Sequence, residues 1–474
     1  MTKFYSILVL LGLSAGSLEQ TKETAPRPLV FTHVTVIDAT GARAKPDMTV
    51  VVVGDRIASI DSSKRVRVPE NAEVVDATAR FLIPGLWDMH VHAFDKNLFS
   101  PLFIANGITG IRDMFSPLAA INQWRKDSKA GTLIGPHIIA AGPIVDGPKP
   151  VVPGSIATSN ATDGVKAVNT VKQGGSDFVK VYSLLPRDAY FAIAIEAKRQ
   201  GMVFAGHVPD SISAAEASDA RQKSIEHLTG VLLACSLRED QVRQEAAERK
   251  LSGANRIISS YIRDQAAALD SFSEKKANEL FARFVKNGTW MTPTLTVLRA
   301  IVLVGNADFR NDPRLSYIPG YLKNTMWGAD AFGLKSRTPD DDVNAKRVFQ
   351  KLLEMVGAMK RAGVQIIAGT DTPNPYVFPG FSLHDELALL VTAGLTPMEA
   401  LQAATRDAAI YLGLLDSLGT VEKGKLADLV LLDANPLLDI GNTKKINAVI
   451  VGGKLIDRTS LDGMLAKVEA ANKN

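Results

Sequence analysis

Residues 84–92, PGLWDMHVH, end a short apolar run with two histidines two positions apart. Side chains two apart in a strand point the same way, so His90 and His92 can bind one metal ion together. Four other apolar runs end in a side chain with metal-binding chemistry. They supply Lys180 in DFVKVYS, His207 in VFAGHVP, His227 in SIEHLTG and Asp371 in QIIAGTD. The chain has seven histidines in 474 residues, and four lie in this set, which indicates a metal site.

The middle of the chain reads as a parallel sheet with crossover helices. From Phe81 to about Leu412, short apolar runs alternate with helical patterns. Candidate strands end near His90, Asp113, Gly142, Lys180–Ser183, His207, His227, Thr292–Thr294 and Asp371. Eight strands are what a closed (β/α)8 TIM barrel requires, and barrel enzymes carry their chemistry at the C-terminal strand ends. We therefore expect an α/β barrel over 84–411 with these side chains at one end.

Both ends of the fold are rich in short β runs. Residues 29–83 and 412–465 carry Val, Ile and Leu runs broken by Gly, Asp and Asn. Flanking segments of the same kind predict one small discontinuous β-sandwich domain, with the barrel inserted between its halves.

Residues 1–19 have the features of a signal peptide. A lysine precedes an apolar run from Phe4 to Leu13, and small residues follow. An uncleaved anchor is the alternative, but the run is shorter than the roughly 20 residues that span a bilayer. We expect a secreted or periplasmic protein without a stable membrane anchor. The single cysteine, Cys235, is expected to be a buried small hydrophobe.

Composition narrows the class of partner. The chain is 46% hydrophobic and 22% charged, as in globular proteins, and its formal net charge is +4. The basic residues form no stripe with interleaved aromatics, so nucleic acid is not an expected partner. A small-molecule substrate is expected, and a homo-oligomer stays open.

The motifs together resemble a known superfamily. PGLWDMHVH, FVKVYS, FAGHVP, SIEHLTG, AGTD and the late KGKLADLVLLDANPL look like the amidohydrolase superfamily, in particular its imidazolonepropionase-like and metal-dependent Xaa-Pro dipeptidase (prolidase-like) branch. The resemblance implies two divalent ions, with zinc as the expected metal. By the same resemblance, His90, His92 and Asp371 hold the more buried ion and His207 and His227 the more exposed one. Lys180 matches the position where a carboxylated lysine bridges both metals.

The expected reaction is hydrolysis of a C–N amide bond by a metal-bridging hydroxide. Two dications lower the pKa of bound water, and Asp371 can pass its proton to the leaving amine. A dipeptide (Xaa-Pro-like) or an N-acyl amino acid is the expected substrate. A lactonase, an esterase or a cyclic-amide (imidazolonepropionase-like) hydrolase would use the same site, and a non-catalytic scaffold relative is the alternative outside enzymes.

Some residues keep two interpretations. Lys180 either is carboxylated or pairs with a carboxylate, which would leave a mononuclear site of His90, His92, His207 and Asp371. Tyr182 follows Lys180 by two and either donates to the tetrahedral oxyanion or packs under a loop. Arg112 and Asp113 either bind substrate or brace the first-strand histidines.

The other histidines and the long insertions complete the prediction. His33, His137 and His384 fall outside the ligand pattern and are expected to make structural hydrogen bonds. Residues 251–345 exceed a plain crossover, so helical excursions over one barrel end are expected, and with the loop VDGPKPVVPGS they are expected to shape substrate choice.

Overall fold

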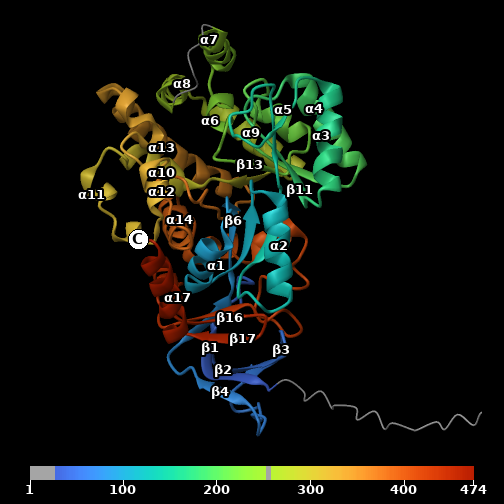
Figure 1. Cartoon of the computed structure of the whole chain (residues 1–474), viewed down its shortest axis with the longest axis vertical. Coiled ribbons are helices and arrows are strands. Elements are labelled where there is room, and N and C mark those ends of the chain that lie inside the picture. Colours follow the sequence, from blue (N-terminus) through green and yellow to red (C-terminus); the bar gives the residue numbers. More distant parts are fainter. Residues whose placement is uncertain (1–26, 252–257, 474) are drawn as a thin grey trace, which may run out of the picture.

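The computed structural model describes residues 27–251 and 258–473. A sheet made from both ends of the chain lies below a larger α/β region, which carries most of the helices (Figure 1). The predicted signal peptide at 1–19 lies outside the described residues. Within the described ranges, no helix has both the length and the apolar character to cross a bilayer.

The terminal sheet joins strands from the two ends of the chain. Its strands run in the order β17-β16-β15-β5-β1-β2-β3, with β4 beside β1. Their bounds are β1 Leu29–Val36, β2 Lys45–Val53, β3 Arg56–Ser62, β4 Glu73–Asp76, β5 Phe81–Pro84, β15 Leu429–Leu432, β16 Ile446–Val451 and β17 Lys454–Asp457. Strand β15 pairs antiparallel with β5, so Val430 lies opposite Ile83. A sandwich of two facing sheets and the limits 29–83, 84–411 and 412–465 stay predictions.

The central region is a TIM-barrel-like α/β fold with parallel strands. Strands β6, β7 and β8 form one sheet, and β10, β9, β11, β12, β13 and β14 form another. Their bounds are β6 Leu86–Val91, β7 Ile108–Asp113, β8 His137–Ala140, β9 Ile144–Asp146, β10 Ile156–Ala157, β11 Phe178–Val181, β12 Val203–Gly206, β13 Ser224–Glu226 and β14 Trp290–Thr292. The amide of Asp177 donates to the Ala140 carbonyl (2.9 Å), which ties β8 to the start of β11.

Residues 365–372 close the ring between β14 and β6. On one side, the Met291 amide donates to the Gln365 backbone carbonyl (2.9 Å). On the other side, the Asp371 amide donates to the His90 backbone carbonyl (2.8 Å). The sequence predicts a regular eighth strand here, but this segment makes only isolated bridges, at Ile366 and Thr372. Its backbone leaves the extended region at Asp371, where φ is +66°. The eighth position of the barrel is therefore an irregular segment that ends in a turn.

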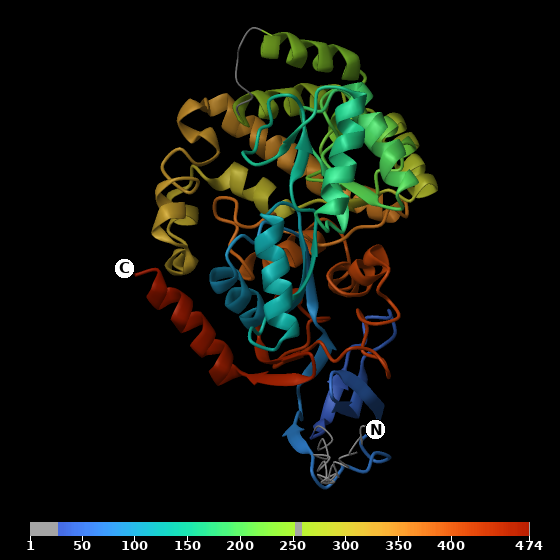
Figure 2. The same cartoon turned by 45° about the vertical axis from the view of Figure 1, so that its right-hand side comes forward.

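Helices cover the outside of the barrel and one of its ends. Their bounds are α1 Lys96–Ala105, α2 Leu118–Lys129, α3 Ala161–Gln173, α4 Arg187–Arg199, α5 Ala214–Asp219, α6 Val231–Ala234, α7 Glu239–Leu251, α8 Ile258–Asp270, α9 Glu274–Asn287, α10 Leu295–Leu303, α11 Ala307–Arg310, α12 Gly320–Asn324, α13 Pro339–Arg361, α14 Phe381–Thr392, α15 Pro397–Ala403, α16 Arg406–Leu412 and α17 Arg458–Ala471. Three 3-10 turns add η1 Pro313–Tyr317, η2 Ala331–Ser336 and η3 Ile440–Lys444. Helix α17, red in Figure 2, leaves the terminal sheet and packs against α1.

Residues 396–413, TPMEALQAATRDAAIYLG, have the apolar spacing of one helix, but the structure interrupts this helix. Thr396 caps its start with a capping box, and Gly413 ends it in the left-handed region, as the sequence indicates. The helix breaks between α15 and α16 because two of its carbonyl groups accept hydrogen bonds from neighbouring barrel segments. The amide of Trp87 donates to Ala404 (2.7 Å) and that of Ala368 donates to Ala403 (3.0 Å).

Three histidines and the cysteine take structural positions. His33 contacts Asp47, and His137 contacts Asp428, each at 2.8 Å. His384 is buried, with Nε2 donating to the Asn106 carbonyl (3.1 Å) and Nδ1 at 2.9 Å from Thr443 Oγ1. Cys235 is buried in the core, and burial raises the pKa of its thiol to about 12.

His384 is expected to make the protein less stable in acid. Burial lowers its pKa to about 4, whereas an unfolded histidine titrates near 6.5. As the pH falls from about 6.5 toward 4, only the unfolded state takes up this proton, so the stability is lost over that window. In urea titrations at pH 7, 6 and 5, the free energy of unfolding of His384→Gln should fall less steeply than wild type, by up to about 1.4 kcal/mol per pH unit.

A buried threonine offers a control that does not titrate. Thr405→Val should leave the pH slope of the wild type unchanged, because Thr405 carries no ionisable group. Equal slopes for wild type and His384→Gln would contradict the assignment of this acid sensitivity to His384.

Candidate functional site

The predicted side chains gather in one cavity at the C-terminal end of the barrel strands. The cavity has a volume of about 520 Å³. Its lining includes His90, His92, Lys180, Tyr182, His207, His227 and Asp371. Segments far apart in the sequence meet here because parallel barrel strands all end on the same face.

Asp371 is the centre of the cluster. Its Oδ1 lies 2.9 Å from His92 Nε2 and 3.4 Å from His90 Nε2, and its Oδ2 lies 3.7 Å from His227 Nδ1. Burial alone would raise the pKa of this carboxyl, but His227, His92 and Lys180 around it lower the pKa overall. The carboxylate is therefore held in its ionised form among cationic and imidazole groups.

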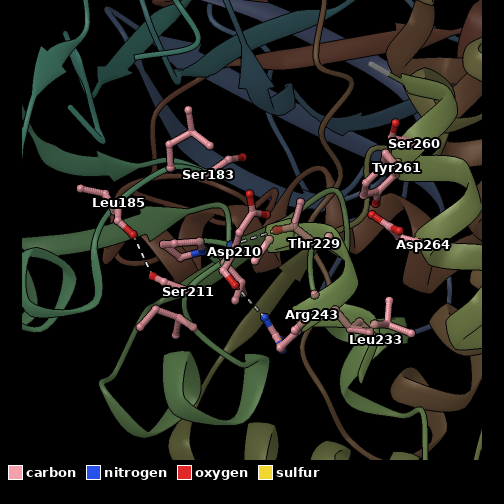
Figure 3. A pocket seen from close by; sticks show the side chains of 18 of the residues that line it. Ser183, Leu185, Asp210, Ser211, Thr229, Leu233, Arg243, Ser260, Tyr261 and Asp264 are labelled. Carbon is pink, nitrogen blue, oxygen red and sulfur yellow. Dashed lines mark hydrogen bonds between the residues drawn. The ribbon is translucent and has the colours of Figure 1, made fainter. Parts of the chain in front are cut away.

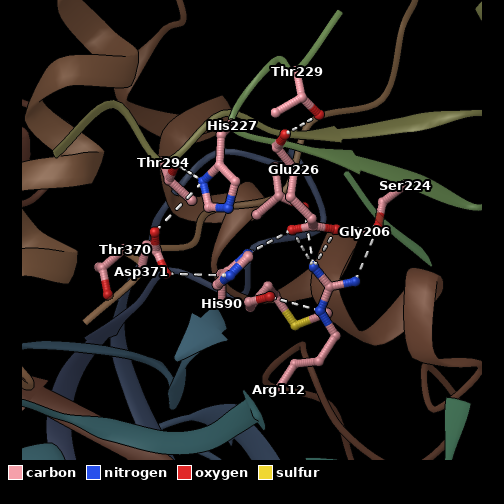
Figure 4. A network of polar contacts seen from close by, with 12 residues as sticks. His90, Arg112, Gly206, Ser224, Glu226, His227, Thr229, Thr294, Thr370 and Asp371 are labelled. Carbon is pink, nitrogen blue, oxygen red and sulfur yellow. Dashed lines mark hydrogen bonds and ion pairs between the residues drawn. The ribbon is translucent and has the colours of Figure 1, made fainter. Parts of the chain in front are cut away.

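A buried carboxylate that the sequence analysis missed orients His90 (Figure 4). Glu226 Oε2 lies 2.8 Å from His90 Nδ1, and both side chains are fully buried. A carboxylate accepts, so Nδ1 carries the proton and Nε2 keeps a lone pair. Nε2 has no hydrogen-bond partner among the described residues, although it is buried. It faces the acceptor oxygen of Asp371, an arrangement that calls for a cation between them.

Arg112 holds Glu226 in place from the other side. Its guanidinium donates to both carboxylate oxygens (2.8 and 3.0 Å) and to Ser224, Tyr411 and the Met89 carbonyl. Arg112 is fully buried and does not line the cavity. Of its two predicted roles, the structure supports bracing of the first-strand histidines.

Asp113 also accepts a hydrogen bond from the backbone that follows the first barrel strand, β6. Its Oδ2 accepts from the Ala93 amide and from Ser116 Oγ, each at 2.7 Å. It too lies outside the cavity lining, so both residues at the end of β7 support the chain that carries His92.

The backbone at the site is tightly constrained. Asp371 and His227 have positive φ values of 66° and 58°, a conformation that costs a non-glycine residue about 1 kcal/mol or more. A Cβ at Gly369 would lie 2.8 Å from His90 Cβ and 2.9 Å from its amide nitrogen. The glycine of AGTD thus lets the eighth segment approach β6 closely enough for Asp371 to reach the histidines.

Lys180, Tyr182 and His207 join the cluster from the ends of β11 and β12. Burial lowers the pKa of Lys180 to about 8, which increases the fraction of neutral amine near neutral pH. The Tyr182 ring stacks on the His207 ring, with centroids 3.9 Å apart. His207 Nδ1 contacts Ser183 Oγ at 2.9 Å, and its ring lies 4.9 Å from that of His227. Tyr182 therefore faces the cavity and also packs, so both interpretations of it stay open.

This donor set suits a divalent metal ion. His90, His227 and Asp371 each offer a ligand atom, and these atoms lie within 4.8 Å of one another. Imidazole nitrogens and a carboxylate oxygen are ordinary zinc ligands, and the orphaned Nε2 of His90 supplies a ligand in the correct tautomer.

A second cavity adjoins the first (Figure 3). It has a volume of about 420 Å³ and shares Ser183, Thr229 and Tyr261 with the first cavity, which holds the predicted metal ligands and is called the metal-ligand cavity from here on. Two backbone carbonyls on its wall are bound by side chains, from Ser211 to Leu185 and from Arg243 to Asp210.

Comparison with known proteins identifies the family. Residues 81–456 match the model of the amidohydrolase family. The chain belongs to this family. Among curated relatives, the ochratoxinase of Aspergillus niger is 41% identical over 104 residues, 21% of this amidohydrolase and 20% of the relative. The imidazolonepropionase of Mesorhizobium japonicum is 44% identical over 79 residues, 16% of this chain and 19% of the relative. The matches thus span about a fifth of these relatives.

Solved structures match over nearly the whole amidohydrolase chain. Bottromycin amidohydrolase superposes with a TM-score of 0.73 and 25% identity, over 95% of this chain and 91% of that one. A putative prolidase from Bifidobacterium longum superposes with a TM-score of 0.65 and 24% identity, over 94% and 99%. Together with the curated relatives, these likenesses support the predicted resemblance to the imidazolonepropionase-like and prolidase-like branch of the amidohydrolase superfamily.

Proposed function

We propose that the protein is a metal-dependent amidohydrolase that hydrolyses a C–N amide bond of a dipeptide, Xaa-Pro-like, or of an N-acyl amino acid. The observation that carries this proposal is the buried Nε2 of His90, which has a lone pair, no described partner, and the Asp371 carboxylate 3.4 Å away. Membership of the amidohydrolase family supports the same reaction class. We also propose export through residues 1–19 and a secreted or periplasmic location.

The proposed site holds two divalent ions, with zinc as the expected metal. His90, His92 and Asp371 would hold one, His207 and His227 the other, and carboxylated Lys180 would bridge them. The lowered pKa of Lys180 supports carboxylation, because only the neutral amine reacts with carbon dioxide. When bound, the ions supply a water of lowered pKa and a Lewis acid for the substrate carbonyl.

The chain's own groups then carry the protons. Asp371 accepts the proton of the attacking water and passes it to the nitrogen of the leaving amine. Glu226 keeps the proton of His90 on Nδ1, so the Nε2 lone pair would bind the metal ion, which leaves Asp371 to accept the water's proton. Tyr182 borders the same cavity, and its hydroxyl is proposed to donate to the tetrahedral oxyanion.

A substrate panel tests the reaction class. Zinc-loaded protein should hydrolyse members of a library of dipeptides and N-acyl amino acids, and chelation should reduce the rate at least 100-fold until zinc is restored. Lactones and esters serve as the comparison, because a lactonase would use the same ligands. Hydrolysis of lactones alone would refute the amidase proposal, and an absence of any hydrolysis by the loaded protein would favour the scaffold alternative.

The number of bound metal ions tests whether Lys180 bridges them. Elemental analysis should find two ions per chain in the wild type and about one in Lys180→Met. Lys223→Met is the matched control, since Lys223 donates to the Tyr411 carbonyl and does not line the cavity. Two ions in Lys180→Met would contradict the bridging role.

A further inference from the structure

The lining of the metal-ligand cavity includes two groups of apolar side chains from different parts of the barrel. One group consists of Phe94, Phe115, Val151 and Val152, from the segments that follow β6, β7 and β9. The other group comes from the excursion after β14, with Val297, Leu298 and Ile301 on α10 and Phe332 in η2. The charged and imidazole groups of the lining lie at or just after the ends of the barrel strands and of the segment 365–372.

Charge is scarce elsewhere in this cavity. Among the described lining residues, Lys180 is the one lysine or arginine, and Asp371 is the one carboxylate. Both belong to the proposed metal ligands. The walls therefore offer a substrate extensive apolar contact and no ionic partner of their own within the described part of the chain.

Val297, Leu298 and Ile301 on α10, called the α10 wall from here on, are fixed relative to Asp371 by hydrogen bonds at the start of the helix. Glu386 accepts from the amides of Leu295 (2.9 Å) and Thr296 (2.8 Å) at the start of α10. Thr296 Oγ1 also lies 3.1 Å from the carbonyl of Thr370, the residue before Asp371. A group bound against Val297, Leu298 and Ile301 would thus sit at a defined distance from the Asp371 carboxylate.

We propose that the substrate carries a bulky apolar acyl group, aromatic or aliphatic, and that this group binds against the α10 wall. The proposal rests on the amidohydrolase function and narrows its substrate class. A cavity of about 520 Å³ lies within the usual range for drug-sized ligands, so it can hold such a group together with an amino acid. Burial of each methylene in an apolar site is worth about a fourfold gain in transition-state binding.

A chain-length series tests the proposal directly. N-acetyl-, N-butanoyl- and N-hexanoyl-L-alanine share one scissile bond and one leaving group, so only apolar contact differs. We expect kcat/KM to rise about fourfold per added methylene, or by roughly 250-fold over the four methylenes from acetyl to hexanoyl. Hydrolysis with a flat or falling profile would overturn the apolar-acyl proposal while leaving the amidohydrolase function intact.

If no member of the series is hydrolysed, binding measurements still test the apolar-acyl proposal independently of the proposed amidohydrolase function. Calorimetric titration with acetate and hexanoate measures apolar affinity without any turnover. Tighter binding of hexanoate by more than tenfold would support the apolar wall even if the amidase function failed. Equal affinities would overturn it.

A pair of variants on α10 locates the acyl site. Ile301→Lys places a charge in the cavity wall, and the hexanoyl-to-acetyl ratio of kcat/KM should fall at least tenfold. Val302→Lys is the matched control, because Val302 is the next residue of α10 and does not line the cavity. An unchanged ratio in folded Ile301→Lys would show that the acyl group does not bind this wall. If Ile301→Lys does not fold, the series on the wild type still decides the proposal.

Discussion

Asp371→Asn is expected to lower kcat by about 10³-fold, within the range that a positioned general base contributes. The amide has the size of the carboxylate but cannot take up the proton of the attacking water. It also removes the negative charge that His227, His92 and Lys180 surround. Steady-state kinetics on the best substrate of the panel gives kcat, and elemental analysis of the same sample gives the metal content.

Metal content decides how this result is interpreted. A variant that keeps both ions and loses kcat supports proton transfer by Asp371, whereas loss of an ion assigns it the ligand role as well. Asp55→Asn, at an exposed aspartate of the terminal sheet, should leave kcat unchanged. Hydrolysis at the wild-type rate by a variant with two bound ions would refute the proton shuttle.

Arg112→Met is expected to cost about 3–5 kcal/mol in the free energy of unfolding, because it leaves a buried carboxylate unpaired. Arg112 and Glu226 are both fully buried, and the guanidinium contacts both carboxylate oxygens. Loss of this pair should also free Glu226 from its position against His90. Urea denaturation followed by circular dichroism measures the change.

A double variant distinguishes the cost of the unpaired buried charge from the cost of lost side-chain packing. Arg112→Met with Glu226→Gln removes the unpaired charge, so it should recover part of the lost stability. Arg187→Met is the control, since Arg187 forms an exposed ion pair with Glu216 that should be worth less than about 1 kcal/mol. A double variant no more stable than Arg112→Met would mean that the unpaired charge is not the cause.

The convergence of the candidate metal ligands in one cavity could be predicted from the sequence because it rests on local rules. Apolar runs that end in His90, Lys180, His207 and His227 indicate strand ends, and parallel strands bring their ends to one face. Local capping rules likewise account for the start of the 396–413 helical segment at Thr396 and its end at Gly413. Local pattern was enough wherever one segment determined its own structure.

Contacts between distant segments could not be predicted in this way. Glu226 precedes His227 in sequence, but nothing local shows that it would reach His90 across the barrel. A signal was present, since a glutamate in a strand and Arg112 in another must be paired if both are buried. The break between α15 and α16 likewise follows from hydrogen bonds to Trp87 and Ala368, which only the folded barrel supplies.

The pairing of β5 with β15 has a consequence for synthesis of the chain. Leu429 in β15 follows Pro84 in β5 by 345 positions. The edge of β5 therefore remains unpaired until β15 has been synthesised and has left the ribosome. At about 5–20 residues per second, this wait is roughly 20–70 s. Throughout it, an apolar strand edge is open to pairing with other chains. We expect the nascent protein to depend on a chaperone that shields this edge until translation is complete.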